Sequence, residues 1–203
     1  NNGSACDGGD IGNPVRSGTG NKWQREIDLP ASAALQLVRT YNANPPFASV
    51  RMGAAWTHSF ARSIDIQSFG AWLYARRADG KAYIFNPSAG GAWATDVDIS
   101  DRLLELKDGS GLRTGWQYIV GSDDSVETYS ASGRLLSIAD RAGRVQILTY
   151  DLPASAGGDD DPDTLDAVVD AAGRQLVFTY DAHKRIATVV DPSGGVIAYG
   201  YDS

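Results

Sequence analysis

The feature that most constrains the fold is a repeat in the second half of the chain. Tyr recurs at intervals of 21, 30 and 21 residues, at Tyr129, Tyr150, Tyr180 and Tyr201. An Asp-x-x-Gly motif keeps step, because its Gly lies seven residues before the next Tyr at Gly143, Gly173 and Gly194. A degenerate earlier copy begins at Asp108. Such a period indicates one supersecondary unit that stacks on its neighbours.

The segments between these markers have the composition of β-strands. β-Branched and aromatic residues are enriched in 144–150, 174–180 and 196–201, and the expected partner strands are 135–139, 165–169 and 186–190. A unit of 21 residues is too short to contain a crossover helix, so consecutive strands are expected to be antiparallel. Asp bonds nearby backbone and Gly accepts a positive φ, so each Asp-x-x-Gly predicts a turn. The repeat therefore predicts a meander of β-hairpins.

Aligning the copies places similar residues in columns. One column holds Leu148, Phe178 and Tyr199, and another holds Ile138, Val168 and Val189. Strand side chains alternate between faces, so each column lies on one face of the sheet. These aromatic residues could form a ligand-stacking platform, but we favour a core role because aromatic side chains supply much of the packing area of a sheet.

The longest interval contains an insertion. Residues 151–163 are polar and end in Asp159, Asp160, Asp161, Pro162 and Asp163. Carboxylates are ligands that Ca²⁺ prefers, but the run lacks the spaced D-x-D-x-D-G loop that orients them. We expect a solvated excursion that breaks the period without adding to the core.

The first half also favours strands. Residues 1–20 are rich in Gly, Asn and Ser and are expected to be loosely ordered. Alternation favours strands within 22–41, 52–60, 63–69, 71–76, 82–85, 103–106 and 116–120, with turns at 79–80, 90–91 and 108–109. No segment has a sustained helical period with caps. We predict an all-β chain with an N-terminal segment (1–20), an N-terminal β region (21–107) and a repeat region (108–203).

Composition excludes several functions. The net charge of −7 and the pI near 4.7 argue against nucleic acid and against anionic membrane surfaces as partners. The single Cys, Cys6, allows no internal disulfide framework and no Cys-based zinc site. No apolar run is long enough for a membrane helix. The sequence begins at Asn1 rather than Met, which predicts a mature product or a fragment.

The sequence offers few candidates for chemistry. Trp56-Thr57-His58 is the most reactive-looking cluster, yet His58 has no nucleophile or second ligand at a known spacing, so we expect a packed or hydrogen-bonded imidazole. Gly18-Thr19-Gly20-Asn21 lacks the ending of a phosphate loop. We therefore assign no catalytic, metal-binding or cofactor-binding residues, and we expect a protein that is not an enzyme.

Several segments resemble a known family. Gly133-Arg134-Leu135, the run from Asp140 to Arg144, and Tyr150-Asp151 are similar to the YD repeat of Rhs (rearrangement hotspot) proteins, with further copies at 180–181 and 201–202. The first half resembles the N-terminal segment of these proteins in residues 12–22, 26–28, 37–42 and 53–60. Together these segments extend over nearly the whole chain.

This resemblance implies a shell rather than a catalyst. In the family, many repeats wind into a hollow β-sheet cocoon, which encloses a C-terminal toxin in bacterial polymorphic toxins and belongs to adhesion proteins in teneurin-like members. Toxin-type members self-cleave at Pro-x4-Asp-Pro-x-Gly-Leu. Asp191-Pro192-Ser193-Gly194 is similar, but Ile186 and Gly195 replace the Pro and the Leu, so we interpret it as a repeat turn.

Two functions follow as expectations. The first is a structural segment of an exported, secreted or cell-surface bacterial protein that forms or seals part of a shell around a toxin or cargo. The alternative is an adhesion module that binds protein or glycan. Expected partners are the remainder of the parent protein and, through the sheet edge, a second copy. The N-terminal half could instead cap that edge with Trp23, Trp56 or Trp72.

Overall fold

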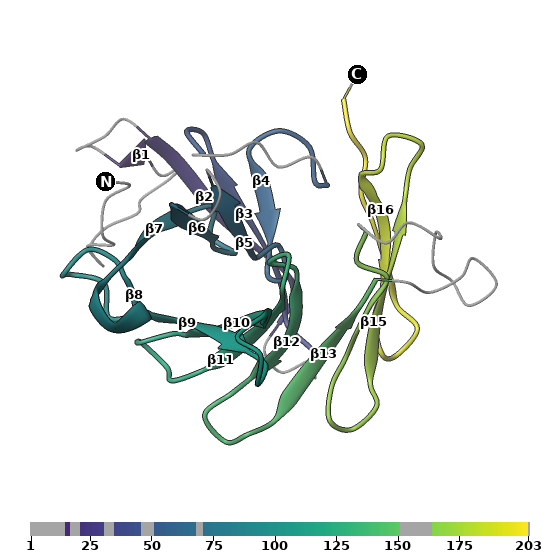
Figure 1. Ribbon diagram of the computed structural model, residues 1–203. Coiled ribbons are helices and arrows are strands. Elements are labelled where there is room, and N and C mark those ends of the chain that lie inside the picture. Colours follow the sequence, from purple (N-terminus) through teal and green to yellow (C-terminus); the bar gives the residue numbers. More distant parts are fainter. Residues whose placement is uncertain are drawn as a thin grey trace.

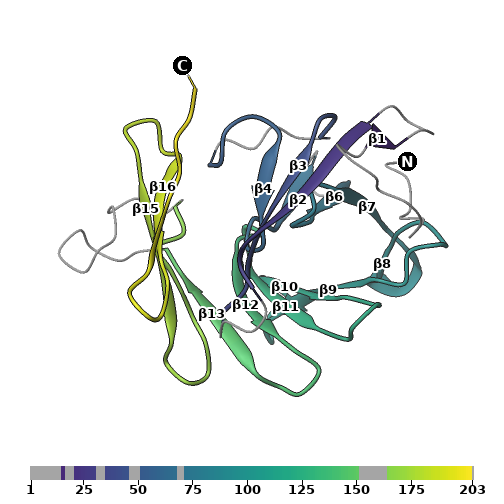
Figure 2. The same cartoon turned by 180° about the vertical axis from the view of Figure 1, so that it is seen from behind.

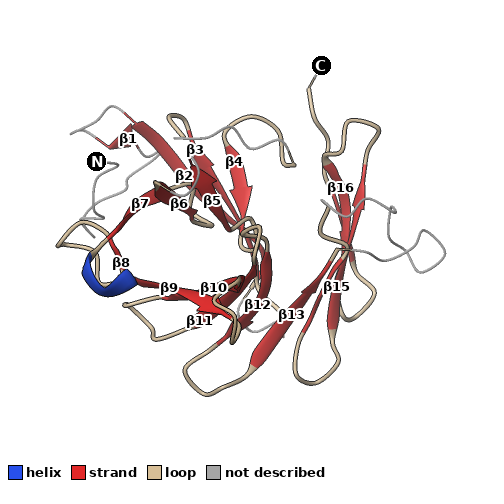
Figure 3. Ribbon diagram, viewed as in Figure 1, coloured by secondary structure: helices blue, strands red, loops and turns tan. Residues whose placement is uncertain are grey.

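The residues that the structure describes form two antiparallel sheets and one turn of 3-10 helix. The computed structural model describes residues 15–16, 21–30, 35–45, 51–67, 71–150 and 164–202 (Figures 1 and 3). The small sheet has the order β1-β2-β3-β4, with bounds Val15–Arg16, Asn21–Leu29, Leu37–Asn42 and Trp56–His58. This sheet comes entirely from the first part of the chain.

The large sheet is a meander of 13 strands in sequence order from β5 to β17. Its strands are β5 (Ser63–Gln67), β6 (Trp72–Arg76), β7 (Ala82–Pro87), β8 (Trp93–Ala94), β9 (Arg102–Lys107), β10 (Arg113–Ile119), β11 (Val126–Ser130), β12 (Leu135–Ala139), β13 (Val145–Thr149), β14 (Ala167–Val169), β15 (Gln175–Tyr180), β16 (Ile186–Val190) and β17 (Val196–Ala198). The prediction of an all-β antiparallel meander is confirmed.

The first strands of the large sheet curl into a ring. The Ile64 N–H on β5 donates to the Gly133 carbonyl at 2.9 Å, and Ser63 forms a bridge with Arg134, in the turn between β11 and β12. Figure 1 shows this ring, strands β5–β11, and beside it a more open wall, strands β12–β17. Large side chains that are almost fully buried fill the ring: Leu73, Phe85, Leu103, Trp116 and Tyr118.

Gly133 makes the closure possible. Its φ is +91°, and a Cβ atom at this position would lie 1.8 Å from the Ile64 carbonyl oxygen. Any other residue would therefore combine an unfavourable backbone conformation with a collision between two backbones.

The repeat turns share one hydrogen-bonding pattern. In the turn between β12 and β13, the Gly143 N–H donates to the Asp140 carbonyl at 2.9 Å, and the N–H groups of Ala142 and Arg144 both donate to Asp140 Oδ1. The same pattern recurs in the turns that begin at Asp108, Asp170 and Asp191. The predicted role of Asp-x-x-Gly is confirmed, and 191–194 is a repeat turn as expected.

One further turn lacks the Gly of the motif. Between β15 and β16, Asp181 accepts the N–H groups of His183 and Arg185, while Lys184 has a φ of +60° at the position that Gly occupies elsewhere. This turn begins with the Asp of the Tyr180-Asp181 pair. The second residue of a YD pair thus caps the hairpin turn that follows.

The Tyr of each pair reaches back to the preceding hairpin. Tyr180 and Tyr201 donate their hydroxyl hydrogens to the carbonyls of Leu165 and Ile186, each 15 residues earlier, at 2.8 and 2.7 Å. The Arg185 guanidinium lies 4.2 Å from the centre of the Tyr201 ring. The Tyr180-Asp181 pair therefore connects two consecutive hairpins.

The predicted columns form the core of the wall. Leu148 pairs with Val168, and Phe178 pairs with Val189, all of them buried. Tyr199 and Ile138 are partly buried against the same cluster. The interpretation of these residues as core is confirmed.

The small sheet lies between the ring and the wall (Figures 1 and 2). Toward the ring, Asn42 Nδ2 donates to the Gly80 carbonyl at 3.3 Å and Thr57 donates to the Ala78 carbonyl at 2.7 Å. Toward the wall, the Ile186 N–H donates to the Arg51 carbonyl at 2.7 Å. Three segments far apart in the sequence are thereby joined.

Some expectations about the first half need correction. The strand predicted across 52–60 is present only as β4, because Gly53 and Ala55 have positive φ angles that are incompatible with a strand. Strand β8 was not predicted, and the turn at Gly90-Gly91 is a 3-10 turn, Ala89–Gly91. The large sheet continues across residues 107–108. The domain boundary expected there stays a prediction. The insertion at 151–163, Cys6 and most of 1–20 lie outside the described residues.

Replacing Gly133 tests the ring closure. We expect Gly133→Ala to lower the free energy of unfolding by more than Gly143→Ala, for which only the positive φ, worth about 1–2 kcal/mol, is at stake. Gly143 is the matched control, because nothing lies within 4 Å of a Cβ atom there. The measurement is chemical denaturation followed by circular dichroism. Equal losses in the two variants would contradict the closure.

Candidate functional site

The most polar part of the interior is a buried ion network between β11 and the start of the ring. Glu127 on β11 is 0% exposed. Arg77 donates to its two carboxylate oxygens at 2.6 and 2.7 Å, and Arg62 and the Tyr129 hydroxyl donate to the same carboxylate. These partners satisfy an ion whose burial would otherwise cost several kcal/mol.

The local fold brings these side chains together. Arg62 immediately precedes β5 and Arg77 follows β6. Glu127 and Tyr129 lie two residues apart on β11, so their side chains point to the same face. Because β5 closes onto the turn after β11, Arg62 lies beside a carboxylate 65 residues later in the sequence. The Arg77 guanidinium also lies 4.0 Å from the centre of the Tyr118 ring.

The network sets the ionisation of its members. Burial alone would raise the pKa of Glu127, but the hydrogen bonds and charge of Arg77, with the charge of Arg62, lower this pKa to about 2. For Arg77, burial would lower the pKa, but the hydrogen bonds and charge of Glu127 raise it above the ordinary value. Burial raises the pKa of Tyr129. The network is thus a salt bridge that stays ionised in ordinary buffers.

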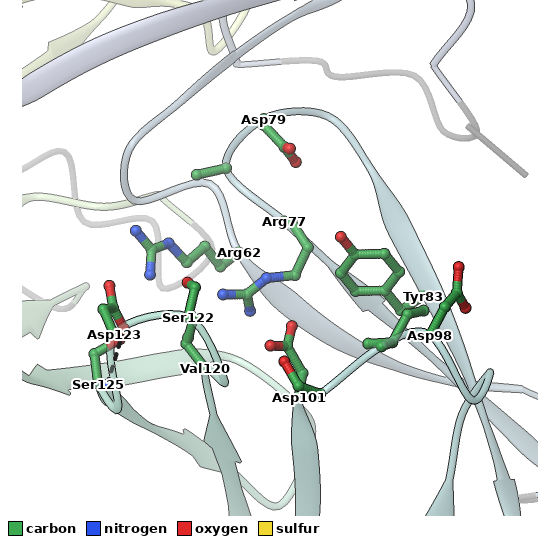
Figure 4. A pocket seen from close by; sticks show the side chains of 13 residues that line it. Arg62, Arg77, Asp79, Tyr83, Asp98, Asp101, Val120, Ser122, Asp123 and Ser125 are labelled. Atoms are coloured by element: carbon green, nitrogen blue, oxygen red, sulfur yellow. Dashed lines mark hydrogen bonds between the residues drawn. The ribbon is translucent and has the colours of Figure 1, made fainter. Parts of the chain in front are cut away.

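A polar pocket of about 390 Å³ opens beside this network (Figure 4). Arg62 and Arg77 point into it from one side, and they are faced by Asp101, just before β9, and by Asp123, in the connection between β10 and β11. Asp101 accepts hydrogen bonds from the Tyr118 hydroxyl and from the Gly121 N–H. Three of the four lining carboxylates, Asp79, Asp101 and Asp123, thus already accept hydrogen bonds from backbone N–H groups.

The pocket does not assemble a recognised catalytic set. Neither His58 nor His183 lines it. Within the described ranges, no three His, Cys, Asp or Glu side chains converge closely enough to hold a metal ion. In the same part of the chain, no helix is long and apolar enough to cross a membrane. The Asp159–Asp163 run and residues 18–20 lie outside the described residues, so their assignments stay predictions.

His58, the candidate taken from the sequence, lies elsewhere. It is on β4, 5% exposed, with its ring centre 6.4 Å from that of Phe60 and 6.0 Å from that of Phe178 on β15. Its Nδ1 accepts the Phe60 N–H at 3.4 Å. Burial, with a smaller contribution from the charge of Arg62, lowers the pKa of His58 to about 4. These contacts are those of a packed side chain at the boundary of the small sheet and the wall.

A polar clamp at the same boundary was not foreseen. Asp28 on β2 accepts two hydrogen bonds from Arg39, at 2.6 and 2.9 Å, and one from the Tyr199 hydroxyl, at 2.7 Å. The Arg39 guanidinium also lies 5.0 Å from the centre of the Trp56 ring and 5.2 Å from that of Tyr199. Trp23, Trp56 and Trp72 were considered as caps for the sheet edge. Of these, Trp56 contacts the clamp, through Arg39.

Removal of the Glu127 charge tests the network. We expect Glu127→Gln to cost about 3–5 kcal/mol of unfolding free energy, because two arginines are left without their counter-ion. The matched control is Glu105→Gln, whose partners Arg113 and Lys107 are partly exposed, with an expected cost of about 0–1 kcal/mol. Similar small losses in both variants, measured by urea denaturation, would show that the network contributes little.

The free energy of unfolding of the wild-type protein should depend on pH differently from that of Glu127→Gln. The pKa of Glu127 is lowered in the fold, so its contribution is complete above about 4.5 and is lost as the pH falls toward 2. The wild-type protein should lose about 3 kcal/mol more than Glu127→Gln over this interval.

Comparison with known proteins adds two matches. A family model described as a domain of unknown function (DUF6531) matches residues 12–85, which include the small sheet and β5 to β7. The RHS Repeat model matches residues 167–196, from β14 to the start of β17. No curated protein matches the chain. The repeat match contains the Tyr180-Asp181 pair whose hydrogen bonds connect neighbouring hairpins, and together the two matches and the meander show that this chain is an Rhs/YD-repeat protein.

Proposed function

We propose that this chain is a non-catalytic structural segment of an exported bacterial Rhs/YD-repeat protein, where it forms or seals part of a shell around a C-terminal toxin or cargo. The observation that carries the proposal is the position of the small sheet, which is hydrogen-bonded to the ring on one side and to the last repeats on the other. A wall that encloses a cargo needs such a connection between distant strands.

The energetic character of the sheet supports this role. Its apolar columns, turn caps and Tyr–carbonyl hydrogen bonds all connect a hairpin to its neighbour, so that stability accumulates along the sheet. The buried charge of Glu127 is bound by Arg62 and Arg77 in the Glu127 network, which supports the ring. Both features suit a continuous wall.

Protection of the C-terminal region tests the shell. We expect that region of the full-length parent protein to resist trypsin, and to become cleavable when residues 21–62 are deleted, because the connection between ring and wall is then lost. The matched control removes nine residues from 152–163, which the sequence predicts to be a solvated excursion, and protection should stay unchanged because shortening such a loop costs little free energy.

Two outcomes would overturn this proposal. One is rapid cleavage of the C-terminal region in the intact parent protein. The other is selective retention of the present chain on a glycan array together with an unprotected C-terminal region, which would favour the adhesion alternative.

The terminal strand provides a test of the expected partners. β17 lies at the edge of the large sheet, and Val196 is 64% exposed, whereas Ile197 packs against the core. Within the part of the chain that the structure describes, no strand pairs with its outer side. We therefore propose that this edge pairs with a second copy of the chain or with the remainder of the parent protein.

Val196→Lys is the appropriate change, because it adds a charge on the edge without entering the core. We expect the isolated chain to form dimers or larger species at high concentration, and the variant to shift this equilibrium toward monomer. Molar mass from light scattering provides the measurement. The control is Ile84→Lys, because Ile84 is exposed but lies on β7, which has a paired strand on each side. A wild-type chain that stays monomeric would show that the edge is not adhesive.

A further inference from the structure

The contact between the small sheet and the wall contains a buried imidazole that forms no ion pair with any carboxylate of the described residues. His58 on β4 packs against Phe60 and against Phe178 of β15. The two phenyl rings also contact each other, with centres 6.3 Å apart and planes at 85°. The imidazole is therefore part of an aromatic cluster that spans the two sheets.

The hydrogen bond of this imidazole requires its neutral form. Nδ1 accepts the Phe60 N–H at 3.4 Å, so the ring proton is on Nε2. A proton added at Nδ1 would remove the acceptor and place two N–H donors toward each other. Protonation thus costs both a hydrogen bond and the burial of a charge.

The charged groups around His58 offer no compensation. Arg62, which follows β4, is positive and opposes protonation. Arg39 pairs with His58 in the register of β3 and β4, but its charge is bonded to Asp28. From β15 the facing side chain is Phe178, which is neutral. Of the carboxylates on neighbouring elements, Glu127 and Asp28 already bind Arg62, Arg77 and Arg39. Asp166 is 0% exposed and its carbonyl accepts the Phe178 N–H, but its carboxylate forms no ion pair with His58.

We propose that the small sheet is an acid-released strut, in which protonation of His58 detaches β3 and β4 from the wall while the ring stays folded. This inference goes beyond the shell function and is tested separately from it, because it concerns the isolated chain and not what a shell encloses.

The other ionic elements of the fold withstand the same acidity. Arg77 and Arg62 keep the pKa of Glu127 near 2, so the ring network is intact when the imidazole titrates. The Arg144 N–H, with the other donors of the turn, lowers the pKa of Asp140, and hydrogen bonds act likewise at Asp108 and Asp191. Acid therefore acts on the strut before it acts on the ring or on these turns.

The sign and size of the effect follow from the two states of His58. Attached to the wall, the imidazole has a pKa of about 4, and once detached it regains the ordinary value of about 6.5. The detached state therefore binds the proton first. The attachment equilibrium constant has its full value well above pH 6.5 and falls about tenfold per pH unit below it, to a limit of about 300-fold that is reached below pH 4.

Hydrogen exchange measures the detachment directly. We expect the protection of the Ile186 N–H, which donates to the Arg51 carbonyl across the contact, to fall about 15-fold between pH 6.5 and 5, after correction for the intrinsic rate at each pH, while residues 113–130 of the ring keep theirs. Ordinary carboxyl groups titrate mainly below this interval, so the imidazole is isolated from them.

Two variants assign the effect. His58→Phe should keep the aromatic packing and show protection that does not change between pH 6.5 and 5. His183→Asn is the matched control, because His183 is the other histidine of the chain and lies exposed in the turn after β15, and it should behave as the wild type. Asp28→Asn should lower the protection at every pH without changing the slope, because it weakens the clamp and leaves His58 in place.

Several results would overturn the proposal. Wild-type protection that does not change with pH, an equal loss in His58→Phe, or a parallel loss in the ring would each do so. If His58→Phe does not fold, the NMR titration of the wild-type imidazole decides, with His183→Asn assigning the resonances. Protonation of His58 while the Ile186 N–H stays protected would then refute the strut.

Discussion

The close approach of Ile64 and Gly133 determines much of this structure. One backbone hydrogen bond joins the first strand of the large sheet to the turn after its seventh strand, and only a residue without a Cβ atom permits it. A meander without this contact is an open ribbon. With it, the first strands enclose their own core, and the position of every later strand is defined relative to a closed ring.

The closure also determines where charge can be buried. Arg62 directly precedes β5, so fixing β5 against the turn after β11 fixes Arg62 against Glu127. Burying a carboxylate and two guanidinium groups is unfavourable unless nearly all their hydrogen bonds are made, and here Arg77 and Tyr129 complete the set. An ion network of this kind penalises any register in which its members are separated. We therefore regard it as a specificity device of the ring more than as a source of net stability.

The repeat half could be predicted from the sequence because its interactions are local. Asp140 caps N–H groups two and four residues away, and Tyr201 reaches a carbonyl 15 residues back, so both leave a fixed period in the sequence. The connection between strands 174–180 and 186–190 was predicted, but the Asp181 cap within it was not, because Lys184 supplies the positive φ that the motif assigns to Gly. The shortened strand β4 was missed for the same reason, since Ala55 gives no sign of its positive φ.

Contacts without a period could not be predicted in this way. Tyr199 and Asp28 are 171 residues apart, and Arg62 and Glu127 are 65 apart, with no motif that marks either pair. Each residue type is ordinary on a strand surface. Only the curvature of the sheet brings the partners together, and curvature depends on single positions such as Gly133 that a pattern search treats as one more turn glycine.

In the Tyr180-Asp181 pair, one residue bonds to the hairpin before it and the other to the turn after it. Tyr180 bonds backward to the hairpin that has already formed, while Asp181 caps the turn of the hairpin that follows. Placing both on adjacent residues makes the end of one strand the point at which two hairpins are coupled. Loss of either residue weakens one connection and leaves the other. The turn that Asp181 caps also forms with Lys184 at the position that Gly occupies in the other repeat turns. A wall built in this way can be extended by adding units without a new core, because each added hairpin is bonded at its first strand to the hairpin before it.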